Sequence, residues 1–186
     1  MLAYVVWHRG GGEVEQHTYE ANIAAFHSAL AELQPEHFLA SMVFSVESLP
    51  WMPATPLYEE WYLMSGSEGL DALDEAVKSE ALVGPHGRLS ANTVALAAAL
   101  MSPRGGETDP LDPSLGIWLH KPADMSYEDF DAAMALALAS DGSGLWQRKM
   151  GLGSSPEFCL LANEQPFGPS DIVEAVTKRE LLFRPH

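Results

Sequence analysis

Two histidines end two similar segments of the chain, and they are the first residues to consider for chemistry. His8 closes the run L-A-Y-V-V-W-H, and His120 closes the run S-L-G-I-W-L-H. An imidazole changes charge near neutral pH, so either histidine could move a proton at a catalytic site. The structural alternative is that each histidine only ends its strand, with a single capping hydrogen bond or a contact with water.

A carboxylate and a phenol on another segment extend this candidate set. Glu60 and Tyr62 alternate in the run L-Y-E-E-W-Y-L-M, so in a strand they lie on one face. Tyr4 and His8 share one face of another strand. We expect this face and the face that carries Glu60 and Tyr62 to line a cavity. A buried Glu60 with a raised pKa could act as a base. The alternative is a solvated carboxylate on an edge strand.

Two tryptophans are predicted ligand contacts. Trp118 lies on the same strand face as His120 and could form an apolar wall of a cavity. Trp51 belongs to the loop Leu49–Pro56, which is rich in proline and poor in charge. That loop could cover the mouth of a cavity or contact a partner chain.

A second carboxylate, Glu157, is also predicted to contact a ligand. When Trp61 is aligned with Phe158, Glu157 takes the position of Glu60. Cys159 then replaces the phenol of the first segment. It is the only cysteine, so no intrachain disulfide can form, and its apolar neighbours indicate a buried thiol rather than a nucleophile.

Several kinds of site have no matching pattern. His17, His27 and His37 lie ten residues apart on different elements, so we expect no metal site and no cofactor. The chain contains no G-x-G-x-x-G, G-K-[ST] or G-x-S-x-G motif, which leaves nucleotide binding and serine hydrolysis without support.

The charge balance bears on partners and location. With 26 acidic and 10 basic residues the net charge is −16, which repels nucleic acid and anionic membrane surfaces. The first residues do not read as a signal peptide, and the apolar stretch Val94–Met101 is too short to span a bilayer. We therefore expect a cytoplasmic protein.

Hydrophobic periodicity predicts alternating strands and helices. The run Thr93–Met101 could be a strand or a helix, and its alanines favour the helix. The predicted strands are Leu2–Arg9, Phe38–Glu47, Leu57–Met64, Leu115–Lys121, Leu145–Leu152 and Glu157–Asn163. The predicted helices are Glu20–Leu33, Ser67–Leu82, Tyr127–Ala139 and Asp171–Leu182.

The chain repeats itself. Besides the two strands that end in histidine, Glu75–His86 matches Glu174–His186 with one extra residue in the second copy. The predicted fold class is α+β, with two tandem ferredoxin-like β-α-β-β-α repeats that form an internal α/β barrel. Residues 1–101 make the first repeat with an additional segment 87–101, residues 102–113 a linker, and residues 114–186 the second repeat.

In element order and duplication the chain resembles the dimeric α/β-barrel superfamily in its tandem form. The resemblance implies two ferredoxin-like units packed sheet against sheet. Members similar to antibiotic-biosynthesis monooxygenases and EthD-type proteins bind small, often aromatic molecules in the barrel interior. It therefore implies a cofactor-independent enzyme or a binder of a small hydrophobic molecule. The alternative is an interaction module whose barrel is filled by its own side chains. A homodimer through Trp51 or Thr93–Met101 is also predicted.

Overall fold

The computed structural model describes residues 1–47, 49–52, 55–110, 113–139, 142–151, 156–166 and 172–185. Within these ranges the chain forms eight β-strands, four α-helices and one short 3-10 helix. The elements are β1 (Leu2–Gly10), α1 (Gln16–Leu33), β2 (Phe38–Val46), β3 (Leu57–Met64), α2 (Glu68–Ala76), α3 (Glu80–Ala91), β4 (Thr93–Gly106), β5 (Leu115–Leu119), α4 (Tyr127–Met134), η1 (Ala137–Ala139), β6 (Gly144–Gly151), β7 (Phe158–Ala162) and β8 (Val173–Phe183).

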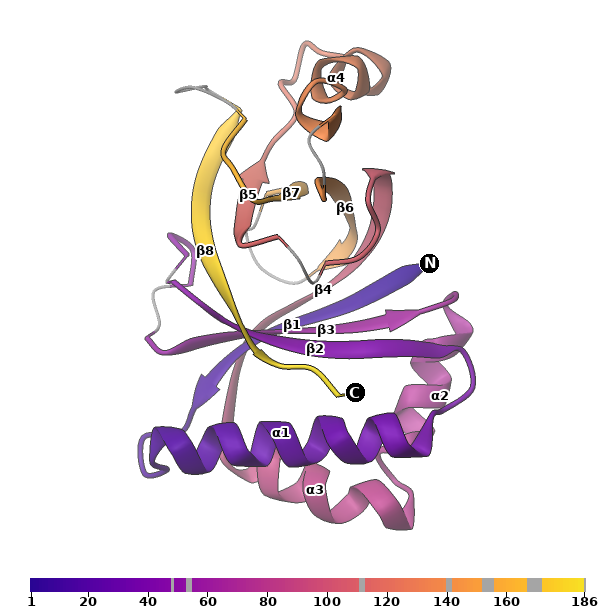
Figure 1. Ribbon diagram of the computed structural model, residues 1–186, viewed down its shortest axis with the longest axis vertical. Helices are drawn as coiled ribbons and strands as arrows, with labels where there is room; N and C mark the ends of the chain where they lie inside the picture. The colour runs from indigo at the N-terminus through magenta and orange to yellow at the C-terminus, as the bar shows by residue number, and fades with distance from the viewer. Residues whose placement is uncertain are drawn as a thin grey trace.

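The strands form one closed antiparallel barrel in the order β1-β3-β2-β8-β5-β7-β6-β4 (Figure 1). The strands of the first half lie in the order β4-β1-β3-β2, and those of the second half in the order β8-β5-β7-β6. Two seams join the halves, because β2 pairs with β8 and β4 pairs with β6. The fold is therefore a mixed α+β fold built on a closed barrel.

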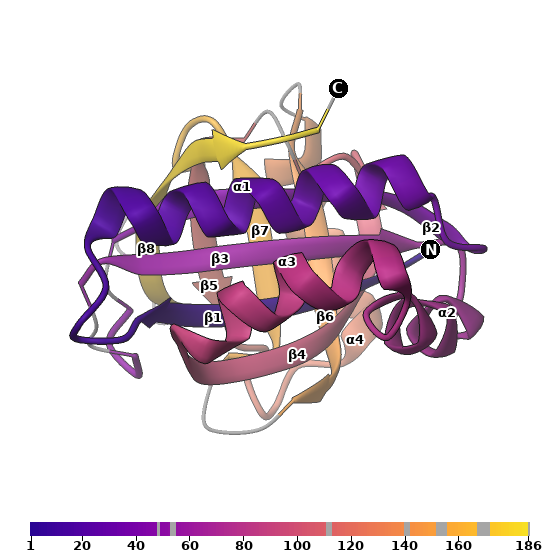
Figure 2. The same ribbon diagram turned by 90° about the horizontal axis from the view of Figure 1, so that it is seen from below.

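The helices cover the two halves unequally. α1, α2 and α3 lie against the first half, and α4 lies on the opposite side of the barrel (Figures 1 and 2). Phe130 and Met134 of α4 pack on Ile117 and its neighbours. Ser126 caps α4 by accepting a hydrogen bond from the Asp129 amide. No helix in the described residues combines the length and apolar character needed to cross a membrane.

The barrel interior is a packed core. Trp7 and Trp118 meet edge to face with ring centroids 5.6 Å apart, and Trp61 and Trp146 do so at 5.0 Å. All four side chains are at most 2 % exposed, and aliphatic residues from both halves fill the space around them. Among the described residues, side chains thus fill the interior where the resemblance implies a ligand cavity.

A buried ion pair crosses this core. Arg179 of β8 donates from Nε to Glu59 Oε1 of β3 over 2.9 Å, and both residues are at most 4 % exposed. The indole N–H groups of Trp7 and Trp61 donate to the same carboxylate over 2.9 and 2.7 Å. The guanidinium also lies over the ring of Phe44, 3.7 Å from its centroid. The network holds β3 of the first half to β8 of the second.

The prediction that the face of β1 and β3 with Tyr4 and Tyr62 lines the barrel interior is wrong. Val5, Trp7 and Trp61 point into the barrel, not toward the helices. Tyr4 and Tyr62 lie on the outer face, packed against residues of α1 and α3. A strand that is buried on both faces gives no alternation between polar and apolar residues, so the sequence pattern does not tell the inner face from the outer one.

The preference for a helix at Thr93–Met101 is also wrong. This run is β4, which pairs with β1 on one side and β6 on the other and extends through Gly106 into the predicted linker. Ala97 and Ala99 pack against the tryptophan-rich core. Small side chains suit an interior that indoles already fill, and pairing on both edges overrides the helical preference of alanine.

The last predicted helix, Asp171–Leu182, is replaced by a strand. Val173–Phe183 is β8, which pairs with β2 and β5, and Asp171 lies outside the described residues. The matched segments Glu75–His86 and Glu174–His186 thus adopt different structures. The predicted helix Ser67–Leu82 is in fact two helices, α2 and α3, and α3 contains Pro85.

Candidate functional site

Glu60 is the centre of a buried polar cluster between the first-half sheet and its helices. Its Oε1 lies 3.0 Å from His8 Nε2 and 3.5 Å from His27 Nε2. The Tyr62 hydroxyl donates a short hydrogen bond to its Oε2. Glu60 is 4 % exposed and the two histidines at most 1 %. Two imidazoles and a phenol therefore surround one carboxylate that is almost completely removed from water.

Strand pairing and helix periodicity bring these residues together. Across the β1–β3 ladder Tyr4 lies opposite Tyr62, so the phenols of the two strands share the outer face. On α1 the buried stripe includes Tyr19, Ile23 and His27 at four-residue intervals, which places them on one side of the helix. The helix thus lays a histidine and a tyrosine over the carboxylate.

A chain of hydrogen bonds determines which nitrogen of His8 carries hydrogen. The Thr93 hydroxyl donates to the Leu89 carbonyl over 2.8 Å, so it must accept from the Tyr19 hydroxyl, 2.8 Å away. Tyr19 has then used its only hydrogen and must accept from His8 Nδ1, 2.7 Å away. Burial raises the pKa of Tyr19 to about 12, which keeps this phenol protonated. His8 Nδ1 therefore carries hydrogen.

His8 Nε2 then faces Glu60 Oε1 at ion-pair distance, and neither atom has a hydrogen bond of good geometry within the described chain. A neutral His8 with hydrogen on Nδ1 would present a lone pair at Nε2 to a carboxylate oxygen 3.0 Å away. Burial favours protonated Glu60, but the charge of His8 and contacts with His27 outweigh it and hold the pKa of Glu60 well below its usual value. The lowered pKa of Glu60 favours an ionised carboxylate in contact with the His8 imidazole.

A pocket of about 510 Å³ opens beside this pair. His8, Glu60 and Tyr62 line its buried side, and Asp74 of α2 and Ser90 of α3 lie at its exposed side. Most of the remaining wall is apolar or aromatic: Tyr4, Val6, Phe26, Leu73, Val77, His86, Leu89, Thr93 and Ala95. A carboxylate, an imidazole and a phenol at one end of an apolar pocket are typical of a small-molecule site.

Four of the residues that the sequence singled out meet in this pocket. His8, Glu60, Tyr62 and Tyr4 share the outer face of β1 and β3. The expectation that they share a face is confirmed by the register. Their place is corrected, because the pocket lies between sheet and helices and not inside the barrel.

The other four lie elsewhere. His120 follows β5 and is exposed, so it does not mirror His8. Trp118 lies in the barrel core, and Trp51 packs against it with ring centroids 5.6 Å apart. Glu157 belongs to a surface network of the second half. None of the four lines the pocket beside Glu60.

Sequence reasoning missed Tyr19, His27, Ser41 and Thr93. His27 carried a usable signal, because it lies four residues after Ile23 and three before Leu30, within an apolar helical stripe. A polar residue in such a stripe needs a buried partner. Nothing local in the sequence distinguishes the other three.

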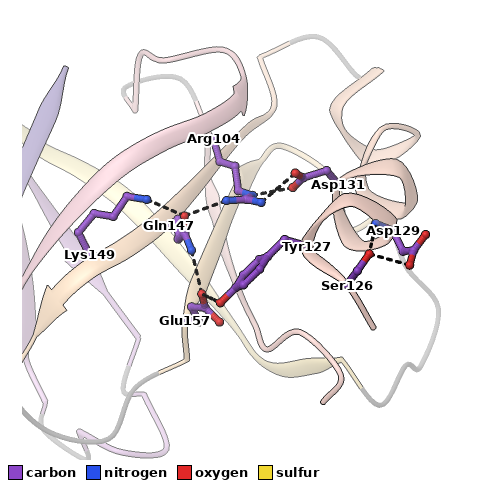
Figure 3. Close-up of polar contacts among 8 residues, drawn as sticks. All are labelled: Arg104, Ser126, Tyr127, Asp129, Asp131, Gln147, Lys149 and Glu157. Carbon is purple, nitrogen blue, oxygen red and sulfur yellow. Dashed lines mark hydrogen bonds and ion pairs between the residues drawn. The ribbon is translucent and has the colours of Figure 1, made fainter. Parts of the chain in front are cut away.

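A polar network joins α4 to β4 and β6 on the side of the barrel away from α1 (Figure 3). Arg104 of β4 forms two parallel hydrogen bonds with Asp131 of α4, over 2.6 and 2.8 Å, and a third with Gln147 over 2.9 Å. Gln147 and Tyr127 both donate to Glu157 over 2.8 Å. These groups satisfy one another, and the network holds α4 to the barrel.

Arg104→Ala is expected to lower the free energy of unfolding by about 1 kcal/mol. The pair with Asp131 is bidentate and partly shielded, with side-chain exposures of 21 % and 46 %. Urea unfolding followed by tryptophan fluorescence measures the change. Lys78→Ala is the matched control, since Lys78 pairs with Asp74 and Glu75 at 58 % exposure. An equal loss in both variants would contradict a structural role for Arg104.

Comparison with known proteins adds information on the fold. No family profile matches the chain, and no curated protein matches it. An anthrone oxidase-like protein of known structure is 10 % identical, with a TM-score of 0.52 over 100 % of this chain and 91 % of its own. A candidate monooxygenase from Lactobacillus acidophilus NCFM is 11 % identical, with a TM-score of 0.47 over 99 % of this chain and 95 % of its own. The first likeness shows that the two chains share a fold.

Proposed function

We propose that the chain is a cofactor-independent acid–base enzyme that converts a small aromatic ketone into its enol. The observation that carries the proposal is the buried His8–Glu60 pair at one end of an apolar pocket of about 510 Å³. Pockets of a few hundred cubic ångströms suit ligands of one to three rings. A buried ion pair that faces such a pocket is typical of proton-transfer sites.

His8 supplies the acid and Glu60 the base. The Nε2 hydrogen of His8 passes to the carbonyl oxygen of the ketone, and Glu60 removes a hydrogen from the adjacent carbon as the enol double bond forms. The charge of His8 lowers the pKa of Glu60, whereas burial raises it. When His8 gives up its proton and loses that charge, the pKa of Glu60 therefore rises. The base thus strengthens as the acid gives up its proton.

The site is restored without another reactant. Glu60 returns its proton to His8 Nε2 over the 3.0 Å that separates them, and the enol leaves. Tyr62 holds Glu60 in position, because burial and the Glu60 charge raise the pKa of its phenol well above the ordinary value. Tyr19 holds His8 by accepting from Nδ1.

The distance between acid and base selects the kind of ketone. With 3.0 Å between Nε2 and Oε1, the two groups match a carbonyl oxygen and the carbon next to the carbonyl. The anthrone named for the structural neighbour is also an aromatic ketone, but its acidic carbon lies across the ring from the oxygen. We therefore favour an acidic C–H directly beside the carbonyl.

We further propose that the two halves are tandem ferredoxin-like repeats joined by residues 107–114. Their identical strand orders and two reciprocal seams support this proposal. In the part of the chain that the structure describes, the first half combines a histidine and a carboxylate with a pocket, and we propose this one as the active site. A homodimer and a cytoplasmic location stay predictions.

A non-catalytic interaction module is the second candidate, and one observation favours it. The barrel interior is filled by its own side chains, as that alternative predicts. The pocket beside Glu60 lies outside the interior, so the filled barrel does not decide between the two functions. A measurement of catalysis by the pocket residues decides between the two functions.

Hydrogen exchange at a probe ketone tests the proposal. The wild type is expected to speed deuterium uptake from D2O into beta-tetralone, an aromatic ketone with an acidic C–H beside the carbonyl, more than into anthrone. His8→Gln is expected to reduce that rate enhancement by about a hundredfold to ten-thousandfold, and NMR of the ketone measures it. His120→Ala, at the exposed histidine, should match the wild type. A folded His8→Gln variant with full activity would contradict the assignment.

A further inference from the structure

His27 is a buried histidine that does not line the pocket. Its ring is 0 % exposed, yet its Nε2 lies 3.5 Å from Glu60 Oε1. Within the described chain neither of these two atoms has a hydrogen bond of good geometry. A buried polar atom without a partner is costly and calls for an explanation. One ring nitrogen of His27 is thus close enough to Glu60 to exchange a proton after a small movement.

The other ring nitrogen leads away from Glu60. His27 Nδ1 lies 2.7 Å from Ser41 Oγ on β2. Ser41 lines a second pocket of about 510 Å³, which shares no residue with the first. The second pocket lies where the end of α1, the start of β2 and the C-terminal segment meet: Ala31, Gln34, Phe38, Leu39, Ala40, Ser41, Arg184 and Pro185. Leu39 is 52 % exposed, so this pocket opens to solvent.

We infer that His27 and Ser41 form a proton path that joins Glu60 to solvent through the second pocket. The inference goes beyond the proposed function, because it assigns the exchange of protons with solvent to residues that never touch the substrate. Two contacts of the His27 ring carry the inference. Its Nε2 lies 3.5 Å from Glu60 Oε1, and its Nδ1 lies 2.7 Å from Ser41 Oγ.

Each transfer conserves protons. In the neutral tautomer with hydrogen on Nδ1, His27 accepts the hydrogen of a protonated Glu60 at Nε2 and gives its Nδ1 hydrogen to Ser41 Oγ. The ring is then in the Nε2–H tautomer, and the reverse sequence resets it. Ser41 passes its own hydroxyl hydrogen to water in the second pocket. An imidazole suits this role because it accepts at one nitrogen and donates from the other. The reverse sequence delivers a proton to the site.

A bound substrate would close the direct route by which the site exchanges protons with solvent. His8, Glu60 and Tyr62 lie on the buried side of the first pocket, and a ligand there would separate them from the exposed side near Asp74. The proposed turnover releases no proton, but exchange of the site's protons with solvent while the ligand is bound then requires a second route. The contact of Glu60 with His27 provides one that stays open while the first pocket is full.

Proton release from a bound phenol tests the path directly. Para-nitrophenol changes absorbance when it ionises, and an upward pH jump in stopped flow measures its rate of proton loss in the pocket. Ser41→Ala and His27→Gln are expected to slow that rate by about a hundredfold. Ser41→Thr keeps the hydroxyl and should retain the wild-type rate. Equal rates in all four proteins would overturn the path.

A second measurement needs no ligand, so it separates the path from the proposed function. NMR follows the exchange of the His27 ring hydrogens with solvent in the free protein. Ser41→Ala is expected to slow that exchange, and Ser41→Thr to leave it unchanged. If para-nitrophenol does not bind but Ser41→Ala slows the ring exchange, the ligand assignment is wrong and the path stands. If exchange is equal in Ser41→Ala and wild type, the path is wrong.

Discussion

Arg179→Met is expected to lower the free energy of unfolding by about 3 to 5 kcal/mol, because it leaves the Glu59 carboxylate charged and unpaired in the barrel core. Glu59 is 1 % exposed, and no water reaches it to replace the guanidinium. The change also removes the hydrogen bonds from Arg179 to the carbonyl groups of Pro110 and Pro113, over 3.1 and 3.0 Å. Urea unfolding followed by the fluorescence of the core tryptophans measures the loss.

A double-mutant cycle separates the ion pair from simple loss of packing. Glu59→Gln combined with Arg179→Met removes both charges and keeps an acceptor for the indoles of Trp7 and Trp61. The double variant is expected to be more stable than Arg179→Met alone, since no unpaired charge remains. Lys178→Met is the matched control one residue away, at 77 % side-chain exposure. If Arg179→Met costs no more than Lys178→Met, the pair does not hold the halves together.

Glu60→Gln is expected to lower the free energy of unfolding near pH 7 by about 2 to 3 kcal/mol, the usual range for hydrogen bonds to a charged group. The loss should shrink in acid. The pKa of Glu60 in the folded protein lies below its ordinary value of 4.5. As the pH falls through the ordinary value, the unfolded chain takes up a proton that the folded protein does not, and the wild type loses stability. The stabilisation is therefore complete above about pH 5 and declines below it.

Urea unfolding at a series of pH values from neutral to acid measures this convergence. Val43→Ala is the matched control, since Val43 lies opposite Glu60 on β2 and is fully buried. It removes buried carbon atoms but no titratable group, so its difference from the wild type should not depend on pH. A Glu60→Gln difference that stays constant into acid would show that Glu60 is not held by charged neighbours.

The fold could be predicted where the pattern of hydrophobic residues was regular. It could not be predicted where the amino-acid composition favoured a different secondary structure. The strands around His8, Phe38 and Glu60 were placed within one or two residues, because β-branched and aromatic runs end at Gly, Pro or charged residues. The strand β4 could not be predicted from its alanines. Its conformation depends on pairing with β1 and β6, and its small side chains fill the space left by indoles that are distant in the sequence.

Several residues of the candidate site could be predicted from the sequence, but the face of the sheet on which the site lies could not. Alternation identifies Tyr4 with His8 and Glu60 with Tyr62 as residues that share a face, and the register confirms both pairs. It does not say which face is inside, since Trp7 and Trp61 are as buried as Tyr62. The apolar stripe of α1 indicates that His27 is buried, but the sequence does not identify Glu60 as its partner, because that contact depends on how α1 packs on the sheet.

The two seams of the barrel have a consequence for self-association. Because β2–β8 and β4–β6 close the barrel within one chain, every strand has a neighbour on both sides. Partial edges remain in the described residues, because β2 pairs with β8 only at Val43–Val46 and β4 pairs with β6 only from Ala99 onward. Growth into fibrils along a complete unpaired strand therefore requires the barrel to open first.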